Sequence, residues 1–197
     1  MSTLRRLLMA NTGGGVLPSG FTQLEYVTSN PTLEGYIDTG VIPKINDTFE
    51  LRVYRRNRNR PFGSDYFYVY IYVNNERWSI FNSSYKDMGT RVLPYSWRTF
   101  RYESKKMYQY TDDGELEYTL SASTKACTKS LNLFRSNGAA ARCDCDISYF
   151  KMTSADGYTL EYIPALRNSD GVVGFYDIAN GVFIPPTSGT FAAGPEV

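Results

Sequence analysis

Residues 66–73 carry the clearest pattern that could do chemistry, a strict alternation of tyrosine with apolar side chains. In a strand, successive side chains point to opposite faces, so this segment separates a tyrosine face from an apolar face. We expect Phe67, Val69 and Ile71 in the core, because a one-residue slip would expose the whole apolar set. The tyrosine rings would then form a flat platform of the kind on which sugars stack.

Two tryptophans, Trp78 and Trp97, are near enough in sequence to extend this platform. The predicted ligand-binding residues are therefore Tyr66, Tyr68, Tyr70, Tyr72, Trp78 and Trp97. The tyrosine pattern also has a purely structural explanation. Tyrosine is favoured in strands and covers a half-buried outer sheet well, with its hydroxyl group in water.

The chain contains no histidine, which removes Ser-His and Cys-His activation of a nucleophile and the usual mixed histidine sites for zinc. Glycosidases of sandwich fold instead place acidic residues at alternate positions of one strand, so that two carboxylates flank the glycosidic bond. The segment 144–146 (Asp-Cys-Asp) is followed by no glutamate, and 115–117 (Glu-Leu-Glu) lacks the aspartate. We therefore predict no catalytic residues, no cofactor and no enzymatic activity.

Four aspartates could also meet a metal ion, because carboxylate oxygens are the ligands that Ca²⁺ prefers. They are Asp112, Asp113, Asp144 and Asp146. Adjacent aspartates are more typical of turns, where they bond to the backbone. We predict turn chemistry and no metal site.

Arginines gather between residues 52 and 60, at Arg52, Arg55, Arg56, Arg58 and Arg60. A nucleic-acid surface would need aromatic rings among the cations and a broad positive face. Asn57, Asn59 and Pro61 indicate a solvated loop instead. The alternative is a loop that meets an acidic neighbour in an assembly.

The length of 197 residues and a hydrophobic content of 42% suit one all-β domain with a substantial core. The formal net charge is +1, and no apolar run approaches the ~18 residues that span a membrane, so we expect neither nucleic acid nor membrane as a partner. Cys127, Cys143 and Cys145 cannot all pair within one molecule. We predict thiols, and one bridge to Cys127 remains an alternative.

Period-2 alternation with regular turn signals continues after residue 20 and predicts about a dozen short strands. Hairpin turns are expected at 74–75, 112–114, 156–157 and 180–181. Strands are expected at 22–28, 48–54, 66–73, 77–81, 99–103, 106–110, 116–120, 131–135, 144–152, 158–163 and 172–177. The fold predicted is a two-sheet antiparallel sandwich over 16–197, with no helix in that range.

Residues 1–15 form a separate unit. Leu4, Leu7 and Leu8 make a short helical apolar stripe beside Arg5 and Arg6, and a run of three glycines follows as a hinge. One interpretation is a frayed terminus. The other is a docking arm that orders on a partner protein, with Leu4, Arg5, Arg6, Leu7 and Leu8 as its contacts.

Both ends of the chain carry a family likeness. The opening residues 17–26 (LPSGFTQLEY) and 35–40 (GYIDTG), with the closing 174–177 (GFYD) and 189–195 (GTFAAGP), resemble a lectin-like β-sandwich family, concanavalin A-like and close to laminin-G-like modules. The resemblance implies a jelly-roll fold over residues 17–197 whose first and last strands lie close together. The family is common in bacteriophages and in surface proteins of gut bacteria.

This resemblance implies a non-catalytic structural or adsorption component of a phage particle, of the head, tail-fibre or decoration type. The expected location is the virion. The expected partners are other virion proteins through the arm and a host-surface glycan through the sandwich, and self-association is a further option. The alternative is a carbohydrate-binding or adhesion module of a bacterial cell-surface protein.

Overall fold

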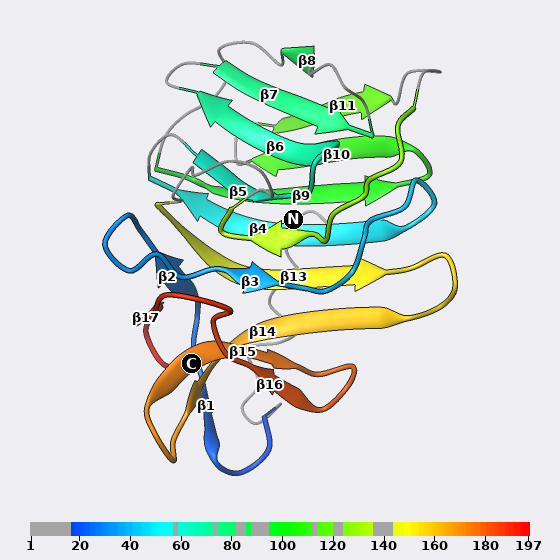
Figure 1. Cartoon of the computed structure of the whole chain (residues 1–197). Coiled ribbons are helices and arrows are strands. Elements are labelled where there is room, and N and C mark those ends of the chain that lie inside the picture. Colours follow the sequence, from blue (N-terminus) through cyan, green and yellow to red (C-terminus); the bar gives the residue numbers. More distant parts are fainter. Residues whose placement is uncertain are drawn as a thin grey trace.

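The computed structural model describes residues 17–56, 59–72, 75–81, 86–87, 95–111, 114–119, 124–135 and 144–197. Within these ranges the secondary structure is all strand, and the paired strands run antiparallel in two sheets (Figure 1). The predicted all-β, two-sheet antiparallel class is confirmed. The arm, residues 1–15, lies outside the described residues.

The large sheet follows the order β11 (Gly114–Thr119), β10 (Lys106–Thr111), β9 (Trp97–Glu103), β4 (Thr48–Arg55), β13 (Cys145–Thr153), β14 (Thr159–Arg167), β15 (Val172–Asp177) and β16 (Val182–Ile184). Three short strands complete it: β1 (Phe21–Gln23) pairs with β14, and β2 (Val27–Ser29) pairs with β13 and with β17 (Ala192–Ala193). Its central strands, β4 and β13, come from distant parts of the chain.

The small sheet follows the order β3 (Ile37–Asp38), β12 (Asn132–Leu133), β5 (Asn59–Gly63), β6 (Phe67–Tyr72), β7 (Asn75–Ile80) and β8 (Lys86–Asp87). It packs over β4, β9 and β10 of the large sheet (Figure 1). A hairpin turn was expected at 74–75. Asn75 already belongs to β7, and residue 74 lies outside the described residues.

The core lies between the sheets and is rich in aromatic rings. Phe49 of β4 meets Phe62 of β5 and Phe67 of β6, with ring centroids 5.3 and 4.8 Å apart. Phe67 and Val69 are buried, as the alternation predicted, whereas the Ile71 side chain lies outside the described part. Burial of each such side chain contributes roughly 1.5–3 kcal/mol, so this layer is the main source of stability.

Two of the expected hairpin turns are confirmed in detail. Ser154 N–H donates to the Tyr158 carbonyl at 2.8 Å, which closes the turn between β13 and β14. Gly181 has φ +69° between β15 and β16, a conformation that favours glycine. Thr111 of β10 pairs with Gly114 of β11, and the intervening residues of the turn expected at 112–114 lie outside the described residues.

The two ends of the described chain are interlocked, as the family likeness implied. Leu24 pairs with Glu196, and Tyr36 pairs with Ser188. The strand β17 pairs with β2 beside the C-terminus (Figure 1). Segments that carried the likeness at opposite ends of the sequence are therefore in contact in the fold.

Several predicted elements need correction. The strand expected at 22–28 is divided into β1 and β2, because Leu24 turns to pair with Glu196. The strand expected at 131–135 shrinks to β12, because Phe134 takes φ +66° and ends the extended chain. Asn59–Gly63 was expected in a solvated loop and is instead the strand β5, held between β6 and β12.

Cys127 and Cys145 are buried thiols, and Cys143 lies outside the described residues. Burial raises the pKa of the Cys127 thiol to about 11, so this residue is an unreactive part of the core.

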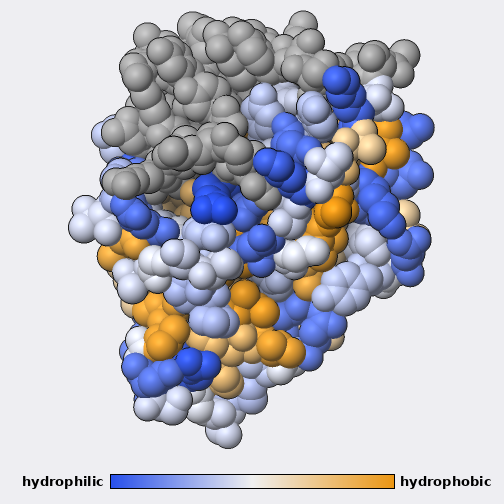
Figure 2. Space-filling model, viewed as in Figure 1, coloured by the Kyte–Doolittle hydropathy of each residue, from blue (hydrophilic) through white to orange (hydrophobic). Residues whose placement is uncertain are grey.

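The face drawn in Figure 2 shows hydrophobic residues gathered mainly in its lower half, where Figure 1 places β15, β16 and β17. Val182 of β16 is 50% exposed. No helix among the described residues is long and apolar enough to cross a membrane.

Candidate ligand-binding face

The structure describes two of the four side chains of the predicted tyrosine platform, so the platform stays a prediction. Tyr66 and Tyr68 are half-buried, and Tyr66 packs against the core with Lys125 Nζ 5.4 Å from its ring centroid. Tyr70 and Tyr72 belong to β6, but their side chains lie outside the described part.

The two tryptophans lie in different sheets, Trp78 on β7 and Trp97 on β9. Trp78 is 1% exposed and belongs to the core, where its ring centroid lies 6.1 Å from that of Phe100. It cannot present a ring to a ligand, because it sits on the inward side of β7 opposite Val69. Trp97 is half-buried on β9 of the other sheet, so it belongs to a different surface from Tyr66 and Tyr68.

The predicted docking residues Leu4, Arg5, Arg6, Leu7 and Leu8 lie outside the described residues.

The outward side of β4 is the centre of a second surface, which sequence reasoning missed. Phe49, Leu51 and Val53 are buried, so the alternate residues Glu50, Arg52 and Tyr54 point away from the core. We call this surface the β4 face: the outward side chains of β4 and those that adjoin them from β9, β10, β13, β14 and the residue before β2. The alternation over 48–54 predicts the strand and its outward residues, but it does not predict which strands lie beside it.

One end of the β4 face is an aromatic cluster. The Trp97 ring lies 5.4 Å from Tyr54 and 5.9 Å from Tyr26, between centroids. The Arg52 guanidinium carbon lies 4.9 Å from the Trp97 centroid, within range of a cation–π contact. Three half-buried rings from three segments thus meet beside an arginine.

The Tyr26 ring is fixed from behind by Gly194. A Cβ atom at Gly194 would lie 2.8 Å from the ring, closer than a side chain allows. The Gly194 N–H also donates to the Tyr26 carbonyl at 3.0 Å. The C-terminal segment therefore positions one ring of the aromatic cluster.

Two of the four aspartates considered as metal ligands, Asp144 and Asp146, hold an arginine at this end, and Asp112 and Asp113 lie outside the described residues. Asp146 is 3% exposed, accepts from Arg56 Nη2 at 2.6 Å and accepts from Thr28 Oγ1 at 2.6 Å. Asp144 lies 3.7 Å from Arg56 Nη1. Burial would lower the pKa of Arg56, but the hydrogen bond and charge of Asp146 outweigh it and raise that pKa. Part of the arginine run thus finds its acidic neighbour within the same chain.

The middle of the β4 face is a row of opposite charges across four strands, β9, β4, β13 and β14. Glu50 is paired in register with Arg101 of β9 on one side and Lys151 of β13 on the other. Lys151 is in turn opposite Glu161 of β14. Arg101 Nη2 lies 2.5 Å from Glu103 Oε2.

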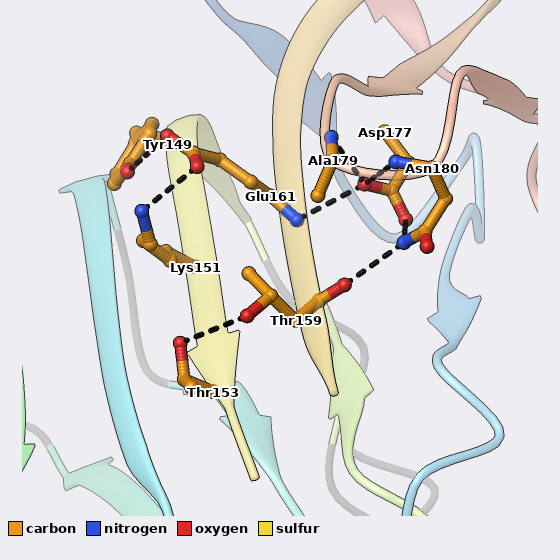
Figure 3. A network of polar contacts seen from close by, with 8 residues as sticks. All are labelled: Tyr149, Lys151, Thr153, Thr159, Glu161, Asp177, Ala179 and Asn180. Carbon is orange, nitrogen blue, oxygen red and sulfur yellow. Dashed lines mark hydrogen bonds and ion pairs between the residues drawn. The ribbon is translucent and has the colours of Figure 1, made fainter. Parts of the chain in front are cut away.

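Glu161 anchors the β14 end of this row (Figure 3). Its carboxylate accepts from the Tyr149 hydroxyl and from Lys151 Nζ, both at 2.8 Å. Burial, followed by this hydrogen bond, raises the pKa of Tyr149 far above its ordinary value. Both oxygens of Glu161 are therefore occupied, and Tyr149 stays a neutral donor.

The same β14 segment is tied to the turn after β15 (Figure 3). Asp177 is buried and accepts from the backbone N–H groups of Glu161, Ala179 and Asn180 at 3.1, 3.1 and 3.3 Å. Asn180 Nδ2 donates to the Thr159 carbonyl at 2.9 Å. This network holds β14 rigidly, so the position of Glu161 is set by backbone contacts.

The far end of the row carries two more tyrosines. Tyr108 and Tyr110 of β10 stack with centroids 6.2 Å apart and planes 14° from parallel. Tyr108 is directly opposite Arg101 in register. The β4 face therefore has aromatic rings on β10, beside the charged row, as well as in the aromatic cluster.

The β4 face combines aromatic rings with charged groups that are held in place. Rings that can stack, surrounded by a few fixed polar groups, are typical of sites for polar organic ligands. Within the described ranges, no group of three or more acidic or cysteine side chains could hold a metal ion. A scan against protein-family models gave no match, and a search of curated proteins found no significant similarity.

Proposed function

We propose that this protein is a non-catalytic glycan-binding module of concanavalin A-like, jelly-roll type, and that the β4 face is its binding surface. The observation that carries the proposal is the cluster of Tyr26, Tyr54 and Trp97 beside Arg52, at centroid distances below 6 Å. Aromatic rings offer flat apolar area to the faces of a sugar, and nearby polar groups bond to its hydroxyls. The interlocked chain ends support the topology, because the family likeness implies that arrangement.

The role that fits such a module is adsorption, as part of a phage particle that meets a host-surface glycan. The support for this role is the likeness at both ends of the chain. Attachment to other virion proteins is assigned to Leu4, Arg5, Arg6, Leu7 and Leu8. A cell-surface adhesion module would use the same β4 face, and mass spectrometry of purified particles and of cell envelopes separates the two.

The binding test uses the full chain on an array of neutral and acidic oligosaccharides, followed by titration of the best ligand. Trp97→Ala should lower the affinity at least tenfold, since ~1.4 kcal/mol of lost contact corresponds to that factor. Tyr158→Ala is the matched control, because Tyr158 is 50% exposed in the turn between β13 and β14. Equal losses in both variants, or no binding by the unaltered protein, would refute the proposal.

Absence of catalysis is tested on the same ligands. The purified protein should release no reducing sugar from any oligosaccharide that it binds. Release that disappears in Glu161→Gln would instead make the β4 face an active site.

A further inference from the structure

Glu50 differs from every other charged side chain in the middle of the β4 face. Within the described part of the chain, no hydrogen bond or ion pair reaches its carboxylate. Its two register neighbours are engaged elsewhere: Arg101 Nη2 lies 2.5 Å from Glu103, and Lys151 Nζ lies 2.8 Å from Glu161. A half-buried acceptor is thus left without a donor at the centre of the face.

This position is unfavourable for the protein alone. Burial raises the pKa of Glu50, although Arg101 and Lys151 act in the opposite direction. A polar group withdrawn from water costs free energy unless a hydrogen bond replaces the lost solvation. A ligand that brings donors to Glu50 would recover that cost on binding.

We propose that the Glu50 carboxylate accepts hydrogen bonds from hydroxyl groups of a neutral glycan, and that it makes the β4 face select neutral over acidic sugars. This inference rests on the proposed function, since it assigns the class of ligand to the same face.

The surrounding charges favour a neutral ligand. Glu50, Glu103 and Glu161 outnumber the cations Arg101 and Lys151 in the row. A carboxylated sugar would bring a like charge against Glu50, and the two cations of the row, Arg101 and Lys151, already hold Glu103 and Glu161. A cationic ligand would meet Arg101 and Lys151 on either side. Hydroxyl groups supply donors without either repulsion.

The geometry also indicates an oligosaccharide. Glu50 and Tyr54 lie four residues apart on β4, which is about 13 Å along a strand. Both point to the same side, with Arg52 between them. A ligand that meets the aromatic cluster at Tyr54 and the acceptor at Glu50 must therefore extend along β4.

The experiment measures affinity by calorimetry for neutral hexasaccharides and for uronic-acid hexasaccharides of matched linkage. It compares the unaltered protein with Glu50→Gln, Trp97→Ala and Glu196→Gln. Glu196→Gln is the charge-matched control, because Glu196 is exposed near the C-terminus and pairs with Leu24 through the backbone. The melting temperature of each variant is recorded in parallel.

We expect Glu50→Gln to lower the affinity for neutral hexasaccharides at least tenfold and to reduce the preference over acidic ones, with its melting temperature equal or higher. Glu196→Gln should match the unaltered protein. Full binding by Glu50→Gln together with lost binding by Trp97→Ala would overturn this inference and leave the proposed function standing. A preference for acidic sugars, or a lower melting temperature for Glu50→Gln, would also overturn it. No binding to either class by the unaltered protein would overturn both proposals.

Discussion

On the small sheet, the tyrosines come from one strand, β6, whereas the rings of the aromatic cluster come from β4, β9 and the segment before β2. Tyr68 lies on a partly covered surface, because Ser79, directly opposite it, is 1% exposed. On the β4 face, Tyr54 and Trp97 are opposite each other and both are half-buried. The two regions thus differ in origin: one set of rings repeats along a single strand, and the other is brought together across strands.

The two regions also differ in whether a carboxylate receives hydrogen bonds from the protein. Asp65, in the connection before β6, accepts from Ser64 Oγ at 2.8 Å and from Thr128 Oγ1 at 2.7 Å. Burial would raise the pKa of Asp65, but these hydrogen bonds outweigh it and lower that pKa to about 2. Glu50 has no such donors, and burial raises its pKa. The first carboxylate stabilises a loop, and the second is left available to a ligand.

The largest expected effect tests which side of β6 faces the core. Val69→Asp should lower the free energy of unfolding by more than ~4 kcal/mol, because it buries an unpaired charge at a fully buried position. Tyr68→Ser should cost only about 1 kcal/mol. Chemical denaturation measures both, and equal losses would mean that the faces of β6 are reversed.

The next largest effect separates the two tryptophans. Trp78→Ala should lower stability by about 3–4 kcal/mol, since it leaves a cavity between the sheets. Trp97→Ala should cost about 1 kcal/mol in stability and lose glycan binding instead. Thermal melts and calorimetry on both variants check this, and a Trp97→Ala protein as unstable as Trp78→Ala would make the aromatic cluster part of the core.

A smaller effect on stability is expected at Arg56, which lies beside the aromatic cluster of the β4 face. Arg56→Ala leaves the buried Asp146 carboxylate without its cation and should cost about 3 kcal/mol. Arg167→Ala breaks the more exposed pair with Asp170 and should cost at most about 1 kcal/mol. Denaturation at low and high salt distinguishes them, because screening weakens only the exposed pair. Similar costs would place Arg56 in solvent.

The smallest effects are pH dependences of opposite sign. The folded pKa of Asp65 lies below its unfolded value of 3.8, so its contribution to stability is present above that pH and is lost as the pH falls toward about 2. The folded pKa of Glu50 lies above its unfolded value of 4.5, so the folded protein binds the proton more tightly. The contribution of Glu50 therefore becomes more favourable as the pH falls from its raised pKa toward 4.5.

These two dependences are measured as differences in unfolding free energy between the unaltered protein and Asp65→Asn or Glu50→Gln, from pH 2 to pH 8. The differences should have opposite slopes and be of the order of 1 kcal/mol or less. Parallel slopes would show that Glu50 has a stabilising partner, and the contrast between the two regions would fail.

Local physics in the sequence was enough to indicate the strands and their inward faces. Alternation at 48–54 and 66–73 predicts strands, because side chains in a strand alternate between its two faces. The turn at Gly181 could be predicted because few residues other than glycine adopt its φ. The likeness at both chain ends also pointed correctly to their contact. The same local reasoning failed at Asn59–Gly63, where pairing with β6 and β12 overrides a polar, proline-containing segment.

Only the tertiary structure decided where the candidate site lies. Glu50, Arg101, Lys151 and Glu161 come from strands that are far apart in sequence, and their row exists because β4 is inserted between β9 and β13. The same topology placed Trp78 between the sheets and Trp97 on the β4 face. Hydrophobic periodicity fixes which side of a strand is buried, but the order of strands depends on long-range packing, which no local pattern encodes.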